Sequence, residues 1–302
     1  MSSYVKSLPG EGQTARREAV PWVSIAWFGA LLIVCYAPVL VRLVSQWATD
    51  EDMGHGFFVP VIAGYIVWQR RAELAKIQPK TNYWGLAVIV WGLLQMLVGA
   101  LGAELFLART AFLISLVGVL LFLWGTRAVR ELAFPLLLLL FMIPIPRIIY
   151  SQITLPLQLF ASNVAAHILE WVGIPVVREG NLLELPSQTL NVVDACSGIR
   201  SLLSLSFLSL IYAYFFDKKV WMRWALLIAT VPIAIAANAG RVTIAGMMSE
   251  YRADLAEGAP HLFEGWVLFL VALVILIGFH QLVNRIYRLV VVHRTAKQGE
   301  RP

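Results

Sequence analysis

The feature of this chain that most constrains its fold is a series of long, nearly uninterrupted apolar segments, most of them long enough to cross a lipid bilayer. A helix needs about 20 predominantly apolar residues to cross a hydrocarbon core of about 30 Å. Only 14% of the 302 residues are charged, whereas charged residues make up about 25% of a typical soluble domain. These segments predict an all-α polytopic membrane protein.

The apolar segments define about eight candidate transmembrane helices. The first is too long for the core of a signal peptide and has no clear small-residue cleavage site, so it is expected to remain as the first span. The second is short and would use flanking residues to cross. The candidates are residues 22–44, 55–68, 83–101, 106–124, 131–145, 196–216, 220–241 and 261–282.

The distribution of charge orients these spans. Basic residues are concentrated in "QRRAELAKIQPK", "GTRAVRE", "DKKVWMR" and the C-terminal "NRIYRLVVVHRTAKQGERP", whereas "SQWATDEDMG" and "SEYRADLAEGAP" are mainly acidic or neutral. With eight spans, every basic segment lies on the side of the N-terminal tail, and basic loops face the cytoplasm. Residues 1–21 and 292–302 would then be cytoplasmic tails, and residues 22–291 a single multi-pass domain.

The net charge of +6 is explained by this orientation and does not predict a nucleic-acid partner. The sequence has no Walker motif and no glycine fingerprint after a strand, so no nucleotide cofactor is expected. Its two cysteines, Cys35 and Cys196, have no paired spacing and no neighbouring Cys/His cluster. Neither a disulfide framework nor a metal site is therefore expected.

Residues 148–172 are apolar but carry polar residues that recur every three or four positions, which is typical of an amphipathic helix. We expect this helix to lie along the outer membrane surface, and the alternative is a ninth span. The following "PVVREGNLLEL" has two short apolar stretches around Gly180 and predicts a small β-hairpin. The polar residues of the helix are Gln158, Ser162, Asn163, His167 and Glu170.

Three chemically reactive or charged residues are expected on the same outer side of the membrane. Cys196 begins the sixth span from outside, and His261 begins the last span from outside. The 22 residues that end at Arg241 would cover about 33 Å at about 1.5 Å per residue, which is close to the thickness of the hydrocarbon core. Topology therefore places Cys196, Arg241 and His261 in one layer.

This combination of side chains suits acyl transfer through a thioester. A cysteine at a helix N-terminus has a stabilised thiolate, a histidine can exchange its proton, and an arginine can stabilise an oxyanion or bind a carboxylate. Other interpretations remain open: Cys196 as an inert small hydrophobe, Arg241 reaching for lipid headgroups, and His261 as a helix cap. Arg200, one turn into the sixth span, is expected to face protein or water.

Several segments resemble blocks of the exosortase/archaeosortase family. The three signature blocks are matched by "NVVDACSGIRSLLSL", "PIAIAANAGRVTIAG" and "HLFEGWVLF", and other recurring blocks by "HGFFVPVIAGYIVWQRR", "FPLLLLLFMIPIP" and "VVREGNLLELP". The resemblance implies a cysteine protease or transpeptidase of the bacterial inner membrane, without cofactor. Its substrates would be secreted proteins that carry a C-terminal PEP-CTERM-type signal: a Pro-Glu-Pro-like motif, a transmembrane helix and a basic tail.

The resemblance places the family's catalytic residues on Cys196, Arg241 and His261, and the histidine matches the bacterial branch. We expect Asp194, Arg200, Asn238 and His55 to contact the substrate or to orient the catalytic residues. The alternative function is a multi-pass transporter or a lipid- or anion-binding scaffold, with Arg200 and Arg241 as an anion site. Spans interrupted by proline, such as "TVPIAIAANAG", are compatible with a transporter.

Overall fold

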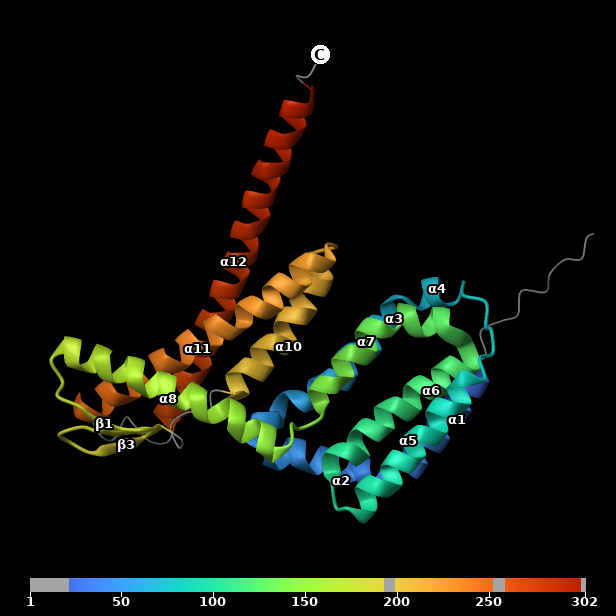
Figure 1. Cartoon of the computed structure of the whole chain (residues 1–302), viewed down its shortest axis with the longest axis horizontal. Coiled ribbons are helices and arrows are strands. Elements are labelled where there is room, and N and C mark those ends of the chain that lie inside the picture. Colours follow the sequence, from blue (N-terminus) through green and yellow to red (C-terminus); the bar gives the residue numbers. More distant parts are fainter. Residues whose placement is uncertain (1–21, 193–198, 252–258, 300–302) are drawn as a thin grey trace, which may run out of the picture. The chain divides into compact units, whose positions relative to one another are not determined.

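The computed structural model describes residues 22–192, 199–251 and 259–299, and for residues 22, 51, 259–264 and 291–299 it describes the backbone alone. The chain divides into two compact units. The first consists of Met1–Leu43 and Pro60–Leu140, and the second of Val44–Val59 and Phe141–Pro302. Both units are built mainly from helices, and the second also contains a small sheet (Figure 1).

The first unit is centred on two long antiparallel helices. Its helices are α1 (Trp22–Cys35), the first part of α2 (Ala37–Thr49), most of α3 (Phe58–Gln69), α4 (Arg71–Leu74), α5 (Trp84–Leu101), α6 (Leu105–Glu131) and α7 (Ala133–Leu138). Helices α5 and α6 lie side by side (Figure 1). Gly85, Gly92 and Gly99 recur every two turns on the buried face of α5 and bring the two backbones close together.

The second unit contains three packed helices that follow one another in the sequence. Its helices are the end of α2, the 3₁₀ helices η1 (Glu51–Phe57) and the end of η2 (Leu139–Met142), α8 (Arg147–Val172), α10 (Ile199–Phe216), α11 (Val220–Tyr251) and α12 (Ala259–Gly299). Helices α10, α11 and α12 contact one another (Figure 1). Their shared core includes the fully buried Leu205, Leu226 and Leu276.

A buried polar network ties the turn between α10 and α11 to α12. Oδ2 of Asp217 accepts hydrogen bonds from Nε2 of His280 at 3.2 Å and from Nδ2 of Asn284 at 3.1 Å. Nζ of Lys219 donates to Oδ1 of Asn284 at 2.8 Å, and the hydroxyl of Tyr212 lies 2.9 Å from Nδ1 of His280. Because Asp217 and His280 are both buried, this network fixes the register of α12 against the turn.

The sheet has three short antiparallel strands in the order β1 (Val177–Glu179), β2 (Leu182–Glu184) and β3 (Thr189–Asn191). Gly180, with φ of 66°, forms the turn between β1 and β2. Its carbonyl accepts hydrogen bonds from Oγ of Ser162 at 2.9 Å and from Nη1 of Arg178 at 3.0 Å. The turn is thereby attached to α8.

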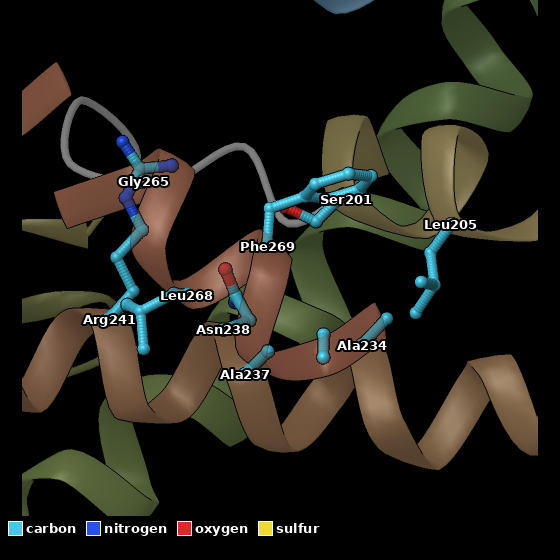
Figure 2. Close-up of a pocket in the computed structure, with 10 residues that line it drawn as sticks. Ser201, Leu205, Ala234, Ala237, Asn238, Arg241, Gly265, Leu268 and Phe269 are labelled. Carbon is cyan, nitrogen blue, oxygen red and sulfur yellow. The ribbon is translucent and has the colours of Figure 1, made fainter. Parts of the chain in front are cut away.

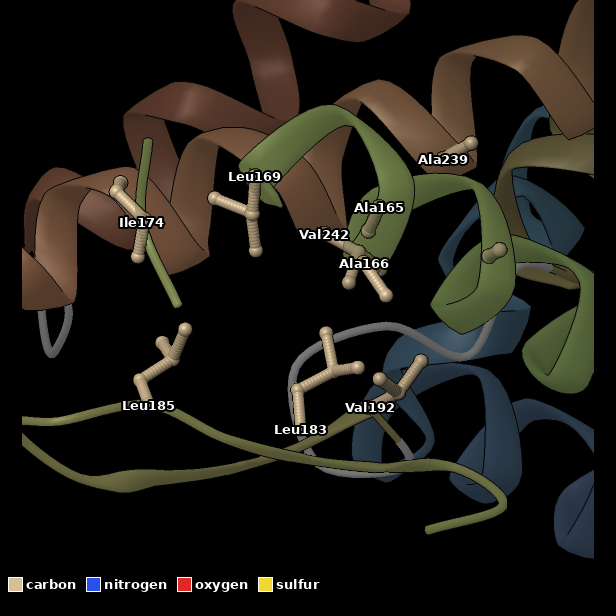
Figure 3. Close-up of a cluster of buried hydrophobic side chains, with 10 residues drawn as sticks. Ala165, Ala166, Leu169, Ile174, Leu183, Leu185, Val192, Ala239 and Val242 are labelled. Atoms are coloured by element: carbon tan, nitrogen blue, oxygen red, sulfur yellow. The ribbon is translucent and has the colours of Figure 1, made fainter. Parts of the chain in front are cut away.

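Apolar side chains on one face of this sheet pack against α8 and α11, as Figure 3 shows. Leu183, Leu185 and Val192 from the sheet region meet Leu169 of α8 and Val242 of α11. The hairpin predicted around Gly180 is therefore confirmed, and a third strand extends it toward residue 193. Because the sheet packs on α11, its position is linked to the helix that carries Arg241.

The predicted class, an all-α polytopic membrane protein with a small β element, is confirmed. Among the described helices, five are long and apolar enough to cross a membrane, or seven if the broken pairs 23–49 and 133–172 each form one span. The prediction was about eight. Helix α3 has only 12 residues, too few to cross alone, and the expected first span is broken at Tyr36 because Pro38 cannot donate a helical hydrogen bond.

The helix expected at 148–172 is present as α8, but its polar residues do not form one solvent-facing stripe. Gln158 and Ser162 are buried, whereas Asn163, His167 and Glu170 are exposed. The buried face of α8 is made mostly of small and polar residues, and it packs on α11 and on the sheet. The polar residues of the expected amphipathic helix are thus divided between its buried and its exposed side.

Candidate functional site

The residues predicted from the sequence differ in how far the structure places them. Cys196 and Asp194 lie outside the described residues. His261 lies in the first turn of α12, where the backbone alone is described. Arg241 and Asn238 lie on α11, and Arg200 lies in the first turn of α10.

Asn238 and Arg241 line a small pocket between α10, α11 and α12, shown in Figure 2. The pocket has a volume of about 10 Å³, close to the room that one water molecule requires. Ser201 of α10 and Gly265 of α12 also line it, and Leu205, Ala234, Phe269 and Ala272 contribute apolar walls. The three helices associated with Cys196, Arg241 and His261 thus converge on one pocket.

The guanidinium of Arg241 lies against the backbone of α12 at Gly265, and Figure 2 shows the side chain extending from α11 toward this glycine. A Cβ at position 265 would lie 3.4 Å from Nη2 of Arg241 and 3.5 Å from its Cζ. Residues 261 and 265 are four apart, which is about one helical turn. Because Gly265 has no side chain, the Arg241 guanidinium can lie against α12 at a point about one helical turn from the backbone of residue 261.

Arg200 is held by a carboxylate that sequence reasoning did not identify. Its Nε donates a hydrogen bond of 2.9 Å to Oδ1 of Asp52 in η1. The hydroxyl of Tyr150 in α8 donates to Oδ2 of the same carboxylate at 2.6 Å. Asp52 itself is positioned by a hydrogen bond from its backbone N–H to Oδ1 of Asp50, the N-cap of η1. Arg200, which was expected to face protein or water, forms this ion pair while its side chain stays 37% exposed.

His55 lies in η1, three residues after Asp52. Its Nε2 is 3.1 Å from the carbonyl oxygen of Phe141, and its ring contacts Phe207 of α10. Because the carbonyl is an acceptor, Nε2 carries a proton in this contact. Burial lowers the pKa of His55, and this outweighs the opposing effects of the Phe141 carbonyl and the Asp52 charge. The ring is therefore neutral near pH 7.

The candidates thus form two groups in the second unit. Asn238 and Arg241 line the pocket with Ser201 and Gly265, whereas His55 and Arg200 contact η1 and its neighbours and are not among the lining residues. Both groups reach the N-terminal part of α10, through Ser201 in the first case and Arg200 in the second. Chemically, the pocket places a permanent positive charge where an oxyanion or a carboxylate can be stabilised.

Sequence reasoning missed Asp52, Tyr150, Ser201 and Gly265. A signal existed for Asp52, because the acidic segment 45–54 was expected on the same side of the membrane as Arg200. A signal also existed for Gly265, which lies within the block "HLFEGWVLF" one turn after His261. Tyr150 and Ser201 have no comparable signal, because their contacts arise only from packing.

Comparison with known families supports the resemblance of the signature blocks. The family described as transmembrane exosortase (Exosortase_EpsH) matches residues 47–278. No curated protein and no solved structure matches the chain. The match begins before η1 and ends within α12, so it includes Asp52, the pocket and the segment that contains Cys196. The chain therefore belongs to the transmembrane exosortases, a family of multi-pass membrane proteases and transpeptidases that act on proteins bearing sorting signals.

Proposed function

We propose that this exosortase is a cysteine transpeptidase that cleaves PEP-CTERM-type signals at the outer face of a bacterial inner membrane. The observation that carries the proposal is the convergence of three helices on one pocket. Helix α10 begins three residues after Cys196, α11 supplies Arg241, and α12 contains residue 261 one turn before Gly265. Two of these helices contain Arg241 and residue 261, and the third begins three residues after Cys196.

In the proposed reaction, the Cys196 thiolate attacks the carbonyl carbon of the scissile peptide bond. His261 takes the thiol proton, and Arg241 stabilises the oxyanion of the tetrahedral intermediate. The C–N bond then breaks, the leaving amine takes the proton from His261, and the acyl group remains on Cys196 as a thioester. An acceptor, either water or an amine, attacks the thioester and releases the thiol.

The second group of residues would position the start of α10 for this reaction. The Arg200–Asp52 ion pair and the hydrogen bond from Tyr150 fix the turn that follows Cys196. Asn238, one turn before Arg241 on α11, is buried and would orient the guanidinium. His55 packs on α10 through Phe207 and would support the same turn. Asp194 is proposed to act beside Cys196 as a further orienting residue.

We propose that the substrate binds with its signal helix beside α10, α11 and α12 and with its basic tail in the cytoplasm. Both termini of the exosortase would then be cytoplasmic, as the basic loops predict. The extended segment of the substrate before the signal helix would add a strand to the small sheet, whose edge strands are β1 and β3. Strand β3 ends five residues before Cys196, so a strand paired there would lead toward the nucleophile.

The test compares the two cysteines of the chain. The full-length protein and its Cys196→Ala and Cys35→Ala variants are each co-expressed with a secreted reporter that ends in a PEP-CTERM-type signal. Cys35→Ala is expected to cleave the reporter normally, and Cys196→Ala is expected to insert in the membrane but leave the reporter intact. Because a thioester is cleaved by hydroxylamine, a hydroxylamine-sensitive adduct of reporter and enzyme should form only when Cys196 is present. Cleavage by Cys196→Ala would refute the proposal.

A further inference from the structure

A large open hollow lies at one end of the first unit, where the segment between α4 and α5 meets α6. Its volume is about 1120 Å³. Lys76, Lys80 and Arg127 line it, together with the aromatic side chains of Tyr83 and Trp84. The lining residues, all within the described part of the chain, include no aspartate and no glutamate. The hollow is therefore cationic.

The positive charge of this hollow is not neutralised by neighbouring carboxylates. Arg70 binds both nearby acids, through Oε2 of Glu73 at 3.1 Å and Oε2 of Glu131 at 2.6 Å. Among residues 22–192, 199–251 and 259–299, no ion pair involves Lys76, Lys80 or Arg127. The three cations are left to attract an anionic ligand.

The rim of the hollow is held in place before any ligand binds. Nδ2 of Asn82 donates to Oγ1 of Thr126 at 3.1 Å, and the backbone N–H of Asn82 donates to the carbonyl of Phe122 at 3.3 Å. Gly125 has φ of 84° inside α6, and a Cβ there would collide with the carbonyl oxygen of Lys80. The segment with the lysines is thus fixed against α6, and the site is preorganised.

An apolar groove continues from the hollow along α5. It has a volume of about 450 Å³ and shares Tyr83 with the hollow. Its lining residues follow helical spacing on one exposed face: Tyr83, Leu86, Ala87, Val90, Trp91 and Leu94. From Tyr83 to Leu94 the helix rises about 16 Å, which is about half of a hydrocarbon core of about 30 Å. The groove therefore has the length of one leaflet.

We propose that the hollow and the groove together bind one anionic phospholipid. Its phosphate diester lies among Lys76, Lys80 and Arg127, and one acyl chain lies in the groove of α5. Tyr83 and Trp84 lie at the junction, as aromatic side chains do where lipid headgroups meet hydrocarbon. A free phosphate ester would match the cations but would leave the groove unused, so the continuity of the two sites favours a lipid.

Native mass spectrometry of the delipidated full-length protein in detergent tests the proposal. The protein is titrated with dioleoyl phosphatidylglycerol and with dioleoyl phosphatidylcholine, which have the same acyl chains and differ in net charge. The first bound phosphatidylglycerol should bind at least about fivefold more tightly than phosphatidylcholine, because the three cations attract its net negative charge, whereas the positive choline of phosphatidylcholine offsets the charge of its phosphate. Equal affinities of the two lipids would overturn the proposal.

A triple variant and a matched control locate the headgroup site. The triple variant Lys76→Gln, Lys80→Gln, Arg127→Gln should lose at least about tenfold in affinity for phosphatidylglycerol. The control Lys218→Gln, Arg285→Gln, Arg288→Gln removes the same charge from exposed residues of the second unit and should bind like the wild type. Equal losses in the two triple variants would show non-specific attraction and overturn the site.

The groove is tested by Ala87→Trp, which fills it and leaves the three cations in place. This variant should bind phosphatidylglycerol at least about fivefold more weakly. Glycerol 3-phosphate, which lacks acyl chains, should not displace the lipid at concentrations comparable to those of the lipid. Displacement by glycerol 3-phosphate, or full lipid affinity in Ala87→Trp, would show that the hollow binds a free phosphate ester instead of a phospholipid.

Discussion

Nε of Arg200 and Oδ1 of Asp52 are joined by a hydrogen-bonded ion pair of 2.9 Å, although the two residues are 148 positions apart in the sequence. The pair connects η1 to the first turn of α10, four residues after Cys196. Tyr150 adds a hydrogen bond to the same carboxylate from α8. Three segments that are distant in sequence therefore meet immediately after the proposed nucleophile.

We predict that Asp52→Asn slows signal cleavage about 10- to 100-fold, because a shift of about 1 Å in the nucleophile has an effect of this size. The substitution keeps the shape of the side chain and removes the charge that holds Arg200. Reporter cleavage by purified enzyme measures the effect. Glu184→Gln, which removes an exposed charge on the sheet, serves as the control. In combination with Arg200→Gln the loss should be less than additive, and additive losses would contradict the assigned pairing.

Substitutions at Gly265 test whether the cleavage rate depends on the position of the Arg241 guanidinium. A control in the same helix shows how much of any effect comes from the stability of α12. Gly265→Ala places a Cβ at ordinary contact distance from the guanidinium and is expected to retain most activity. Gly265→Leu displaces the guanidinium and should reduce the cleavage rate about 100-fold, as loss of an oxyanion donor does. Gly278→Leu is the matched control, because a Cβ at Gly278 in the same helix meets nothing within 4 Å. Equal activity of the two leucine variants would argue against the role of Arg241.

The neutral state of His55 predicts a loss of stability in mild acid. Burial lowers the pKa of His55 below its ordinary value of 6.5 in the folded protein. At pH values between the lowered pKa of the folded protein and the ordinary pKa of the unfolded chain, the unfolded chain binds a proton that the folded protein does not. Stability therefore falls as pH decreases through this range. The loss should begin below about pH 6.5 and level off below the folded-state pKa. Thermal unfolding in detergent from pH 8 to pH 5 measures it, and His55→Gln should show a shallower decline over this range.

The buried network around Asp217 should contribute to the attachment of α12. Asp217→Asn replaces an acceptor of two side-chain hydrogen bonds by a group that also donates, and is expected to reduce the free energy of unfolding by about 1–3 kcal/mol. Chemical unfolding of the purified protein checks this value. Glu184→Gln, at an exposed position, should leave the midpoint unchanged. An unchanged midpoint in Asp217→Asn would show that the network does not stabilise the fold.

The membrane class and the hairpin could be predicted because both depend on local patterns. Hydropathy measures burial in lipid directly, and Gly180 marks a turn between two short apolar stretches. The end of α11 could not be predicted in this way. The predicted span ends at Arg241, but the helix continues to Tyr251 through alanine, methionine and glutamate, because these residues are good helix formers.

The partners of the candidate residues were less accessible to sequence reasoning. Arg200 was recognised as unusual because a charge within an apolar segment needs a partner. The identity of that partner depends on how η1, α8 and α10 pack, which no periodicity records. The same holds for Gly265, because the absence of a side chain there matters only for the neighbouring guanidinium of Arg241. The residue types indicated which side chains could take part in the chemistry of the site. Which residues contact them is determined by tertiary packing.

If a substrate strand pairs with the sheet as proposed, the extension of α11 beyond Arg241 would set a distance for the substrate. From Arg241 to Tyr251 the helix rises about 15 Å, and the sheet is attached along this segment through Val242 and through the hydrogen bond from Ser187 to the Ser249 carbonyl at 3.2 Å. A substrate strand added to the sheet would therefore be held at a constant height above the pocket. On this proposal the helix would keep the sheet at a fixed distance from the pocket, so that the number of residues between the signal helix and the cleavage point, more than their identity, would decide where the substrate is cut.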